Sequence, residues 1–188
     1  MDELVGLYRQ ALEGFGARVA AVRDDQWERP TPCADWSVRQ LVNHVVGENA
    51  WAVPLLAGRT IADVGDQLDG DLLGADPVAA WQYTASPAVA AASADGALER
   101  TVHVSFGDIS GREYLSQITT DHVVHAWDLA RGAGGDEALD PELVAFAYEY
   151  IEPQVEGWRA AGAFGPSVDV PKSASLQDRL LGLTGRQP

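Results

Sequence analysis

The chain has little of what marks secreted, membrane-spanning or disulfide-stabilised proteins. Cys33 is the one cysteine among 188 residues, so no disulfide can form within the chain. Charged residues or glycines interrupt every apolar stretch before it reaches the roughly 18 residues that a membrane span needs. The opening residues, MDELVGLYRQ, are acidic rather than basic, which is untypical of a signal peptide. We therefore expect a cytoplasmic protein without a membrane segment.

Positive charge is also scarce. Lysine and arginine number 13 against 28 acidic residues, which gives a formal net charge of −15. Such a surface repels phosphate backbones and anionic lipids, so neither nucleic acid nor membrane is an expected partner. A hydrophobic content of 46% is ordinary for a globular protein, and the length predicts one domain over residues 1–188.

The spacing of the apolar residues indicates helices. They recur every three or four positions over residues 2–22, which predicts an amphipathic helix. A second helix is expected to begin at Ser37, because Gln40 stands where a capping box needs it, and Pro54 should kink or end it. Further segments combine helical spacing with capping residues or Asp-Pro pairs, and these are 76–92 (with a break or kink at Pro87), 110–135, 140–161 and 173–185.

Two segments lack helical spacing. Residues 58–75 are acidic and dotted with glycine but do not follow the calcium-loop pattern, so we expect a solvated crossover. Val102, Val104 and Phe106 alternate before Gly107, which predicts a short strand or hairpin arm. The fold class is therefore predicted to be all-α: a helix bundle with a short β-hairpin arm and a C-terminal helix.

The segment TTDHVVHAWDLA, residues 119–130, carries Asp121, His122 and His125. Helical positions four apart differ by about 40° and positions three apart by about 60°, so His125 can share a ligand with either Asp121 or His122. Periodicity places His122 in the middle of the apolar stripe, as a partner of His125 or as a core histidine. Asp121 lies on its flank, where a buried carboxylate needs a cation or another partner.

A third metal ligand would have to come from another helix. His44, in LVNHVVGEN, lies at the edge of the inward face of the second helix, and Glu48 one turn later is an alternative ligand. From spacing alone, a core histidine or a surface Asp–His pair explains the pattern better than a metal site does. His103 falls in the expected hairpin and is left out. Cys33 is interpreted as a small buried thiol rather than a nucleophile, because no histidine is near it in sequence.

Three stretches of the chain resemble, in order, a known family. They are PTPCADWSVRQLVNHVVGEN, DHVVHAWDLARGAG and FGPSVDVPKSASLQDRLLGLTGRQP. Together they are similar to an actinobacterial group of the DinB-like superfamily, related to the N-terminal metal-binding domain of mycothiol-dependent maleylpyruvate isomerase. The likeness covers nearly the whole chain. It implies a four-helix bundle of up-down-down-up topology with a long crossover between its second and third helices.

The resemblance also implies a divalent-metal site. Matched residue by residue, the family's ligand positions are His44, Asp121 and His125. His122 falls where relatives carry an apolar residue, which places it in the core. Whether His122 or Glu48 joins the site stays open. Three nitrogen and oxygen ligands with one open position are typical of a catalytic metal, with zinc expected and nickel as a substitute.

The function implied by the resemblance is that of an enzyme. We expect a metal-dependent S-transferase or isomerase that uses a low-molecular-weight thiol, mycothiol, on a small electrophilic substrate. A metal-dependent hydrolase with Glu48 as general base is one alternative, and a non-catalytic helical protein that binds a small molecule or forms a homodimer is another.

Several other side chains have two interpretations. Asp128 would either orient a metal ligand or serve as a hydrogen-bond partner near the helix end. Trp51 and Trp127 would line a pocket or fill the core. Three arginines could grip substrate carboxylates, although their spacing does not show it: Arg131, Arg179 and Arg186.

Overall fold

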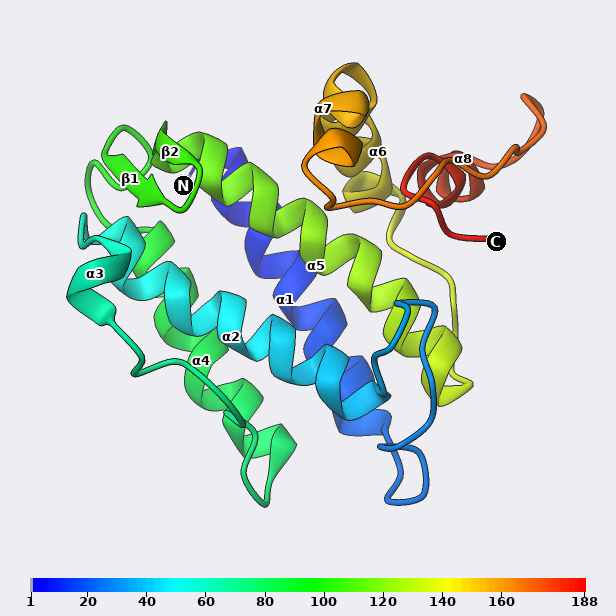
Figure 1. The fold of residues 1–188 in the computed structure, drawn as a ribbon, viewed down its shortest axis with the longest axis horizontal. Helices are drawn as coiled ribbons and strands as arrows, with labels where there is room; N and C mark the ends of the chain where they lie inside the picture. Colours follow the sequence, from blue (N-terminus) through cyan, green and yellow to red (C-terminus); the bar gives the residue numbers. More distant parts are fainter. Residues whose placement is uncertain (1) are drawn as a thin grey trace.

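Four long helices form the body of the protein, whose computed structural model describes residues 2–188 (Figure 1). They are α1 (Glu3–Ala21), α2 (Val38–Leu56), α4 (Pro77–Ala92) and α5 (Gly111–Ala133). Each packs against two others, in the circular order α1, α4, α2, α5. Helices α1 and α5 run in one direction and α2 and α4 in the other. This arrangement confirms the predicted four-helix bundle of up-down-down-up topology.

The helices begin where their capping residues predict. The Ser37 side chain accepts a hydrogen bond from the Gln40 amide, and the Gln40 side chain bonds back to the Ser37 amide, so the capping box of α2 is formed. Asp76 caps α4 in the same way through the amide of Ala79. Pro54 lies in the last turn of α2, which ends two residues later. Pro87 is accommodated inside α4.

The core lies between the four helices and is largely apolar. Trp81 of α4 stacks on Phe15 of α1, with ring centroids 4.9 Å apart. Gly16 permits this approach, since a Cβ atom there would stand 2.3 Å from the Trp81 indole nitrogen. The glycine that weakens α1 as an isolated helix is therefore required by its packing.

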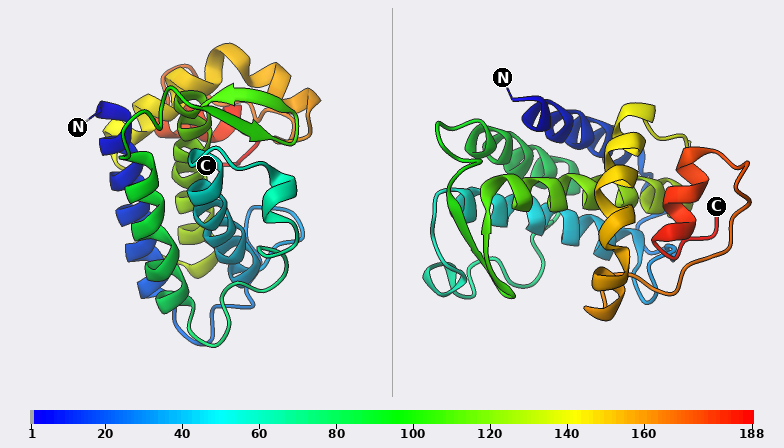
Figure 2. Two further views of the ribbon diagram at one scale, coloured as in Figure 1. Left: turned by 90° about the vertical axis from the view of Figure 1, so that its left-hand side faces the viewer. Right: turned by 90° about the horizontal axis from the view of Figure 1, so that it is seen from above.

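The helical turn α3 (Ile61–Val64) and the hairpin lie together at one end of the bundle (Figure 1). This turn belongs to the predicted crossover, and the sequence analysis did not anticipate it. The predicted hairpin is formed by β1 (Thr101–Val104) and β2 (Gly107–Ser110), antiparallel with Val104 opposite Gly107 (Figure 2). Phe106, expected in the strand, lies in the tight turn and its side chain is 67% exposed.

The C-terminal third packs on α5. The helix predicted over 140–161 is interrupted: α6 (Pro141–Ile151) is followed by the 3₁₀ turn η1 (Glu152–Gln154) and by α7 (Val155–Ala160). Pro153 explains the break, because proline lacks the amide proton that a continuous helix needs. The predicted C-terminal helix is α8 (Leu176–Leu183), which packs on α6. Within residues 2–188, no helix has the length and apolar character to cross a membrane.

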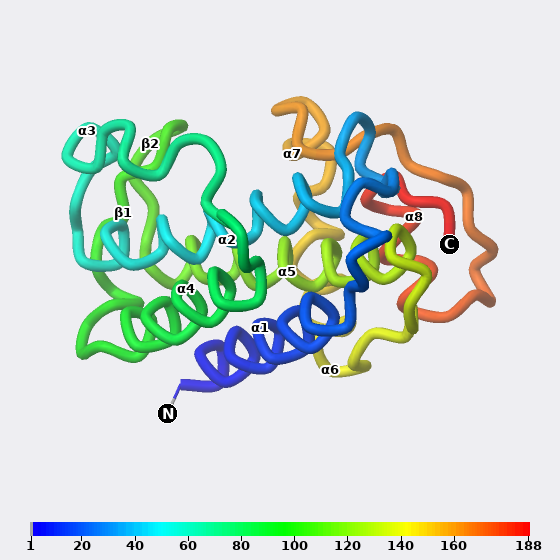
Figure 3. The backbone as a smooth tube through the Cα atoms, turned by 90° about the horizontal axis from the view of Figure 1, so that it is seen from below, coloured from blue at the N-terminus to red at the C-terminus, as the bar shows by residue number. Residues whose placement is uncertain are grey.

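Figure 3 shows that α8 and the C-terminus lie at the same end of the bundle as the connection between α1 and α2. A contact between Arg186 and Cys33, 153 positions apart in sequence, agrees with this view. Both segments therefore approach the same end of α5.

Candidate functional site

The three residues matched to ligand positions meet between α2 and α5. His44 projects from α2, and Asp121 and His125 stand one turn apart on α5. The His44 Nε2 atom is 3.4 Å from one carboxylate oxygen of Asp121, and the His125 Nε2 atom is 3.4 Å from the other. One potential ligand atom from each residue lies within 4.8 Å of the other two. The structure thus brings together all three residues; that they hold a metal remains a prediction.

The donor set fits a divalent metal. Ligand atoms that share one tetrahedral zinc ion at about 2.1 Å lie about 3.4 Å apart, and each of the two imidazole Nε2 atoms lies at this separation from one of the two Asp121 oxygens. The Asp121 Oδ2 atom is buried and receives no hydrogen bond from the described residues, although one third of the whole side chain is exposed. A buried carboxylate oxygen without a donor is costly, and a cation between the three side chains would remove that cost.

The charges around Asp121 also favour a cation. Burial alone would raise the pKa of Asp121, but the two imidazoles outweigh it and lower the pKa below its usual range. Burial would lower the pKa of His44, and the Asp121 carboxylate reverses this and raises it. A proton on His44 therefore neutralises Asp121 when no metal is bound, and protons and metal compete for this position.

His125 is held in position by a buried carboxylate on its own helix. Its Nδ1 atom lies 2.9 Å from Asp128 Oδ2, and because a carboxylate only accepts, Nδ1 carries the proton. The lone pair of Nε2 is then free on the side of Asp121. This geometry supports the first of the two roles considered for Asp128, which is to orient a ligand.

Arg186 completes this arrangement from the C-terminal segment. Its guanidinium bonds both Asp128 oxygens, at 2.9 Å and 3.3 Å. Burial alone would raise the pKa of Asp128, but the His125 hydrogen bond and the Arg186 charge outweigh burial, and the pKa is lowered. Arg186 therefore pairs with Asp128 and does not bind a substrate carboxylate, which was the role considered for it from the sequence.

The connection between α1 and α2 contributes two residues that the sequence analysis did not assign to the site. The Trp36 ring lies 4.8 Å from that of His44 and 6.0 Å from that of His125. The Cys33 sulfur lies 3.6 Å from His125 Nδ1, so a histidine is near it in space although none is near in sequence. Both residues lie in the stretch PTPCADW, which was one of the segments that carried the family resemblance.

Cys33 is half-buried and remains a thiol. Burial and the Asp128 carboxylate raise its pKa to about 12, despite the nearby Arg186. It donates to Asp128 Oδ2 at 3.1 Å. Cys33, His125 and Asp128 are also close enough to hold an ion. The Arg186 guanidinium already supplies the positive charge on that side, so we assign this group to a hydrogen-bond network.

The remaining candidate residues fall outside the triad. His122 is fully buried, with Nδ1 2.6 Å from the Ile118 carbonyl oxygen and Nε2 3.0 Å from the Asn49 amide group, so it is a core histidine. His103 pairs with Asp108 across the hairpin. Glu48 is half-buried one turn beyond His44, and burial together with Asp121 raises its pKa to about 7.

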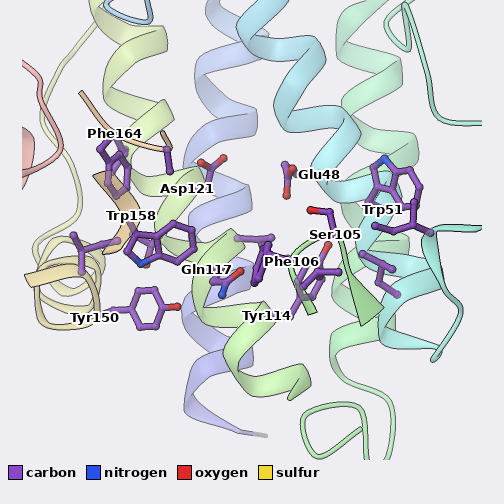
Figure 4. Close-up of a pocket in the computed structure, with 18 residues that line it drawn as sticks. Glu48, Trp51, Ser105, Phe106, Tyr114, Gln117, Asp121, Tyr150, Trp158 and Phe164 are labelled. Carbon is purple, nitrogen blue, oxygen red and sulfur yellow. The ribbon is translucent and has the colours of Figure 1, made fainter. Parts of the chain in front are cut away.

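A cavity of about 400 Å³ adjoins the triad (Figure 4). Asp121 and Glu48 form part of its wall, and the rest comes from α2, α3, the hairpin, α5 and residues 150–164. Trp51 lines it, whereas Trp127 is buried in the core. Arg131 instead pairs with Glu137, and neither it nor the other two arginines considered as substrate grips lines the cavity. Asp121 thus links the triad to a space large enough for a small molecule.

Comparisons with known proteins agree with this architecture. The family described as the mycothiol maleylpyruvate isomerase N-terminal domain matches residues 8–130. Two uncharacterised proteins of Mycobacterium tuberculosis, Rv0738 and MT0763, are each 33% identical to the chain over 99% of its length and 98% of theirs.

Two solved structures have a similar fold. A crystal structure of the mycothiol-dependent maleylpyruvate isomerase superposes with a TM-score of 0.70 and 16% identity, covering 98% of this chain and 88% of that one. A crystal structure of a histidine-to-alanine mutant of a mycothiol-dependent maleylpyruvate isomerase superposes with a TM-score of 0.63 and 18% identity, covering 92% of this chain and 77% of that one. At this identity the likeness concerns the fold, which is consistent with the DinB-like architecture. With the family match over most of the bundle, the chain belongs to the mycothiol maleylpyruvate isomerase N-terminal domain family.

Proposed function

We propose that this protein is a divalent-metal-dependent enzyme that uses a small thiol, mycothiol, to isomerise a small electrophilic substrate or to transfer the thiol to it. The observation that carries the proposal is the convergence of His44, Asp121 and His125 beside a cavity whose wall includes Asp121. Family membership supports the thiol, because the solved relatives of this fold are described as mycothiol-dependent.

Three side chains would bind the metal, and others orient these ligands. His44, Asp121 and His125 would hold the metal, zinc in the first instance and nickel as a substitute. A metal held there would supply Lewis acidity and would favour the thiolate form of a coordinated thiol. Asp128 keeps the proton of His125 on Nδ1, away from the ligand side. The Trp36 ring packs beside both imidazole rings and helps to hold them in place.

Metal content tests the proposal. Protein purified without a histidine tag, stripped with chelator and reconstituted with zinc should hold about one equivalent, and His44→Ala should hold less than about a tenth. His103→Ala is the matched control, because His103 also pairs with an aspartate but lies on the hairpin. Wild-type protein that retains less than about a tenth of an equivalent of zinc, nickel or iron would refute a metal enzyme.

Activity then distinguishes thiol chemistry from other metal chemistry. The loaded enzyme should consume mycothiol with an electrophile, or isomerise a substrate only when mycothiol is present. If the His44→Ala variant loses this mycothiol-dependent activity and the His103→Ala variant retains it, the thiol reacts at the triad.

Hydrolysis is the second candidate, and one observation favours it. Glu48 shares the cavity wall with Asp121, and its pKa of about 7 suits a general base at neutral pH. Such an enzyme would turn over esters or amides without any thiol and would lose activity in Glu48→Gln while retaining its metal. Thiol-independent turnover of this kind would replace the first proposal.

A further inference from the structure

The cavity beside the triad has no positive charge in its wall. Among the described residues that line it, two carry carboxyl groups, Glu48 and Asp121, and none is lysine or arginine. The arginines of the C-terminal segments are engaged elsewhere: Arg179 bonds the Tyr148 hydroxyl, and Arg159 bonds Glu156 and the Leu183 carbonyl oxygen. A carboxylate that entered the cavity would therefore meet no arginine fork, which is the usual partner of such a group.

Aromatic and aliphatic side chains make up most of the wall. Six aromatic residues take part, from α2, the hairpin turn, α5 and the segment after α5: Trp51, Phe106, Tyr114, Tyr150, Trp158 and Phe164. Two of the three large hydrophobic side chains exposed on the described surface, Ile61 and Phe106, also line this space. Exposed apolar groups around an aromatic cavity are typical of a site for an apolar ligand.

The polar groups in the wall are few and neutral or acidic. The Tyr150 hydroxyl and the Gln117 amide both bond the Glu113 carboxylate, so they are already engaged. Thr120 is only 2% exposed, and its hydroxyl is buried without a hydrogen-bond partner among the described residues. A hydroxyl can donate to or accept from a neutral carbonyl or ester group, and it gives little compensation for burying a full negative charge.

From these observations we infer that the cavity binds an uncharged, flat, largely apolar substrate, such as an aromatic carbonyl or ester compound, and discriminates against dicarboxylates. The inference rests on the proposed function for the chemistry that follows binding. The wall also lies within a protein of net charge −15, which adds to the repulsion of a dianion. The electrophile that the enzyme acts on is thus a neutral molecule.

Binding of a matched pair of probes tests this without any turnover. Dimethyl phthalate and phthalate share the same ring, and only the second carries two negative charges. Calorimetric titration of metal-free and zinc-loaded protein should give an affinity for the diester at least about tenfold above that for the dianion. Equal affinities, tighter binding of phthalate to the metal-free protein, or no binding of either probe would overturn the inference.

Two pairs of variants locate the binding. Trp158→Ala removes one aromatic wall and should weaken diester binding by about tenfold, whereas Tyr83→Ala, on the exposed face of α4, should not. Ser105→Arg adds a positive charge at the cavity and should reduce the preference for the diester several-fold. Ser86→Arg adds the same charge on exposed α4 and should leave the preference unchanged. Diester binding that is insensitive to Trp158→Ala lies outside the cavity and would also overturn the inference.

The two proposals can fail separately. Zinc content is measured on the same samples, and metal-free His44→Ala should keep the preference for the diester. A protein that prefers the diester but holds no zinc would lose the proposed function and keep the cavity assignment. A protein that holds zinc but prefers phthalate would keep the proposed function and lose the cavity assignment.

Discussion

His122 and His125 stand three residues apart on α5, in surroundings of opposite character. The His122 ring lies edge-on to Tyr8 and Phe15, with centroids 5.7 Å and 6.2 Å away, and is fully buried. Burial lowers its pKa to about 4, although the nearby Asp121 partly opposes this. His125 instead lies between two carboxylates, Asp121 and Asp128, with a cavity beyond the first of them.

The comparison shows that the neighbouring helices, more than the residue type, decide what a histidine does. The face of α5 that carries His122 meets aromatic rings of α1 and, across the core, Trp81 of α4, so a neutral imidazole serves there as a polar core residue. The face that meets α2 and the C-terminal segment offers carboxylates and a second imidazole, so the same side chain becomes a potential ligand. Four experiments can break or sharpen this contrast.

The largest difference should appear in metal binding. His125→Ala removes one of the three proposed ligands and should lower zinc affinity by more than the roughly hundredfold that loss of a ligand's hydrogen-bond partner costs. His122→Ala, three residues away, should bind zinc as the wild type does. Competition with a chromophoric chelator measures both affinities. Equal affinities in the two variants would mean that His125 is a passive histidine like His122.

The second difference concerns the free energy of unfolding, which His122→Ala should lower more than His125→Ala does. His122→Ala opens a cavity between α1, α4 and α5 and removes the imidazole contacts to the Ile118 carbonyl oxygen and to Asn49, which keeps its hydrogen bond from the Tyr8 hydroxyl. It should reduce the free energy of unfolding by about 3 kcal/mol. His125→Ala in chelator should cost less, because Asp128 keeps Arg186 as a partner. Urea unfolding monitored by circular dichroism measures this, and a larger loss for His125→Ala would contradict it.

Local chemistry made much of this predictable from sequence. Helix starts followed from capping side chains such as Ser37 and Asp76, and the helical period placed Asp121 and His125 on one face of α5. The same period also put His122 in the apolar stripe, where the structure has it. For the third position the helical pattern offered His44 with Glu48 as an alternative, and the family resemblance selected His44, because spacing within one helix cannot show which residue of another helix faces it.

The contributions of the loops could not be predicted in the same way. Cys33 and Arg186 reach Asp128 from 95 and 58 positions away, and no periodic pattern records such contacts. Arginines look alike in sequence whether they face substrate or a buried carboxylate, so Arg186 was considered for the wrong role. Pro153 was overlooked as a helix breaker because apolar residues continue on both sides of it.

A third experiment tests the buried partner of His125. Asp128→Asn should weaken zinc binding by about tenfold to a hundredfold, because a neutral amide holds the Nδ1 proton less firmly and pairs poorly with Arg186. Asp108→Asn makes the same change in the exposed His103–Asp108 pair and should leave zinc affinity unchanged. The same competition assay serves, and an unaltered affinity in Asp128→Asn would reduce that residue to a structural role.

The smallest effect is the pH dependence of stability in metal-free protein. The pKa of His122 is lowered to about 4 on folding, so the unfolded chain binds its proton first as pH falls. The stability that this residue contributes is complete above its ordinary pKa of about 6.5 and is lost as pH falls toward 4. Between pH 8 and pH 6 the wild type should lose about 1 kcal/mol more than His122→Gln does.

His44 provides the matched comparison because its shift has the other sign. Asp121 raises the pKa of His44 against the effect of burial, so His44 stabilises the fold at low pH, and this contribution is lost as pH rises through its folded-state pKa. The difference in unfolding free energy between wild type and His44→Gln should therefore slope with pH in the opposite direction to that for His122→Gln. Denaturant unfolding of both variants in chelator, from pH 8 to pH 5, gives the two slopes. Slopes of the same sign would show that the two sides of α5 do not differ in charge as the structure indicates.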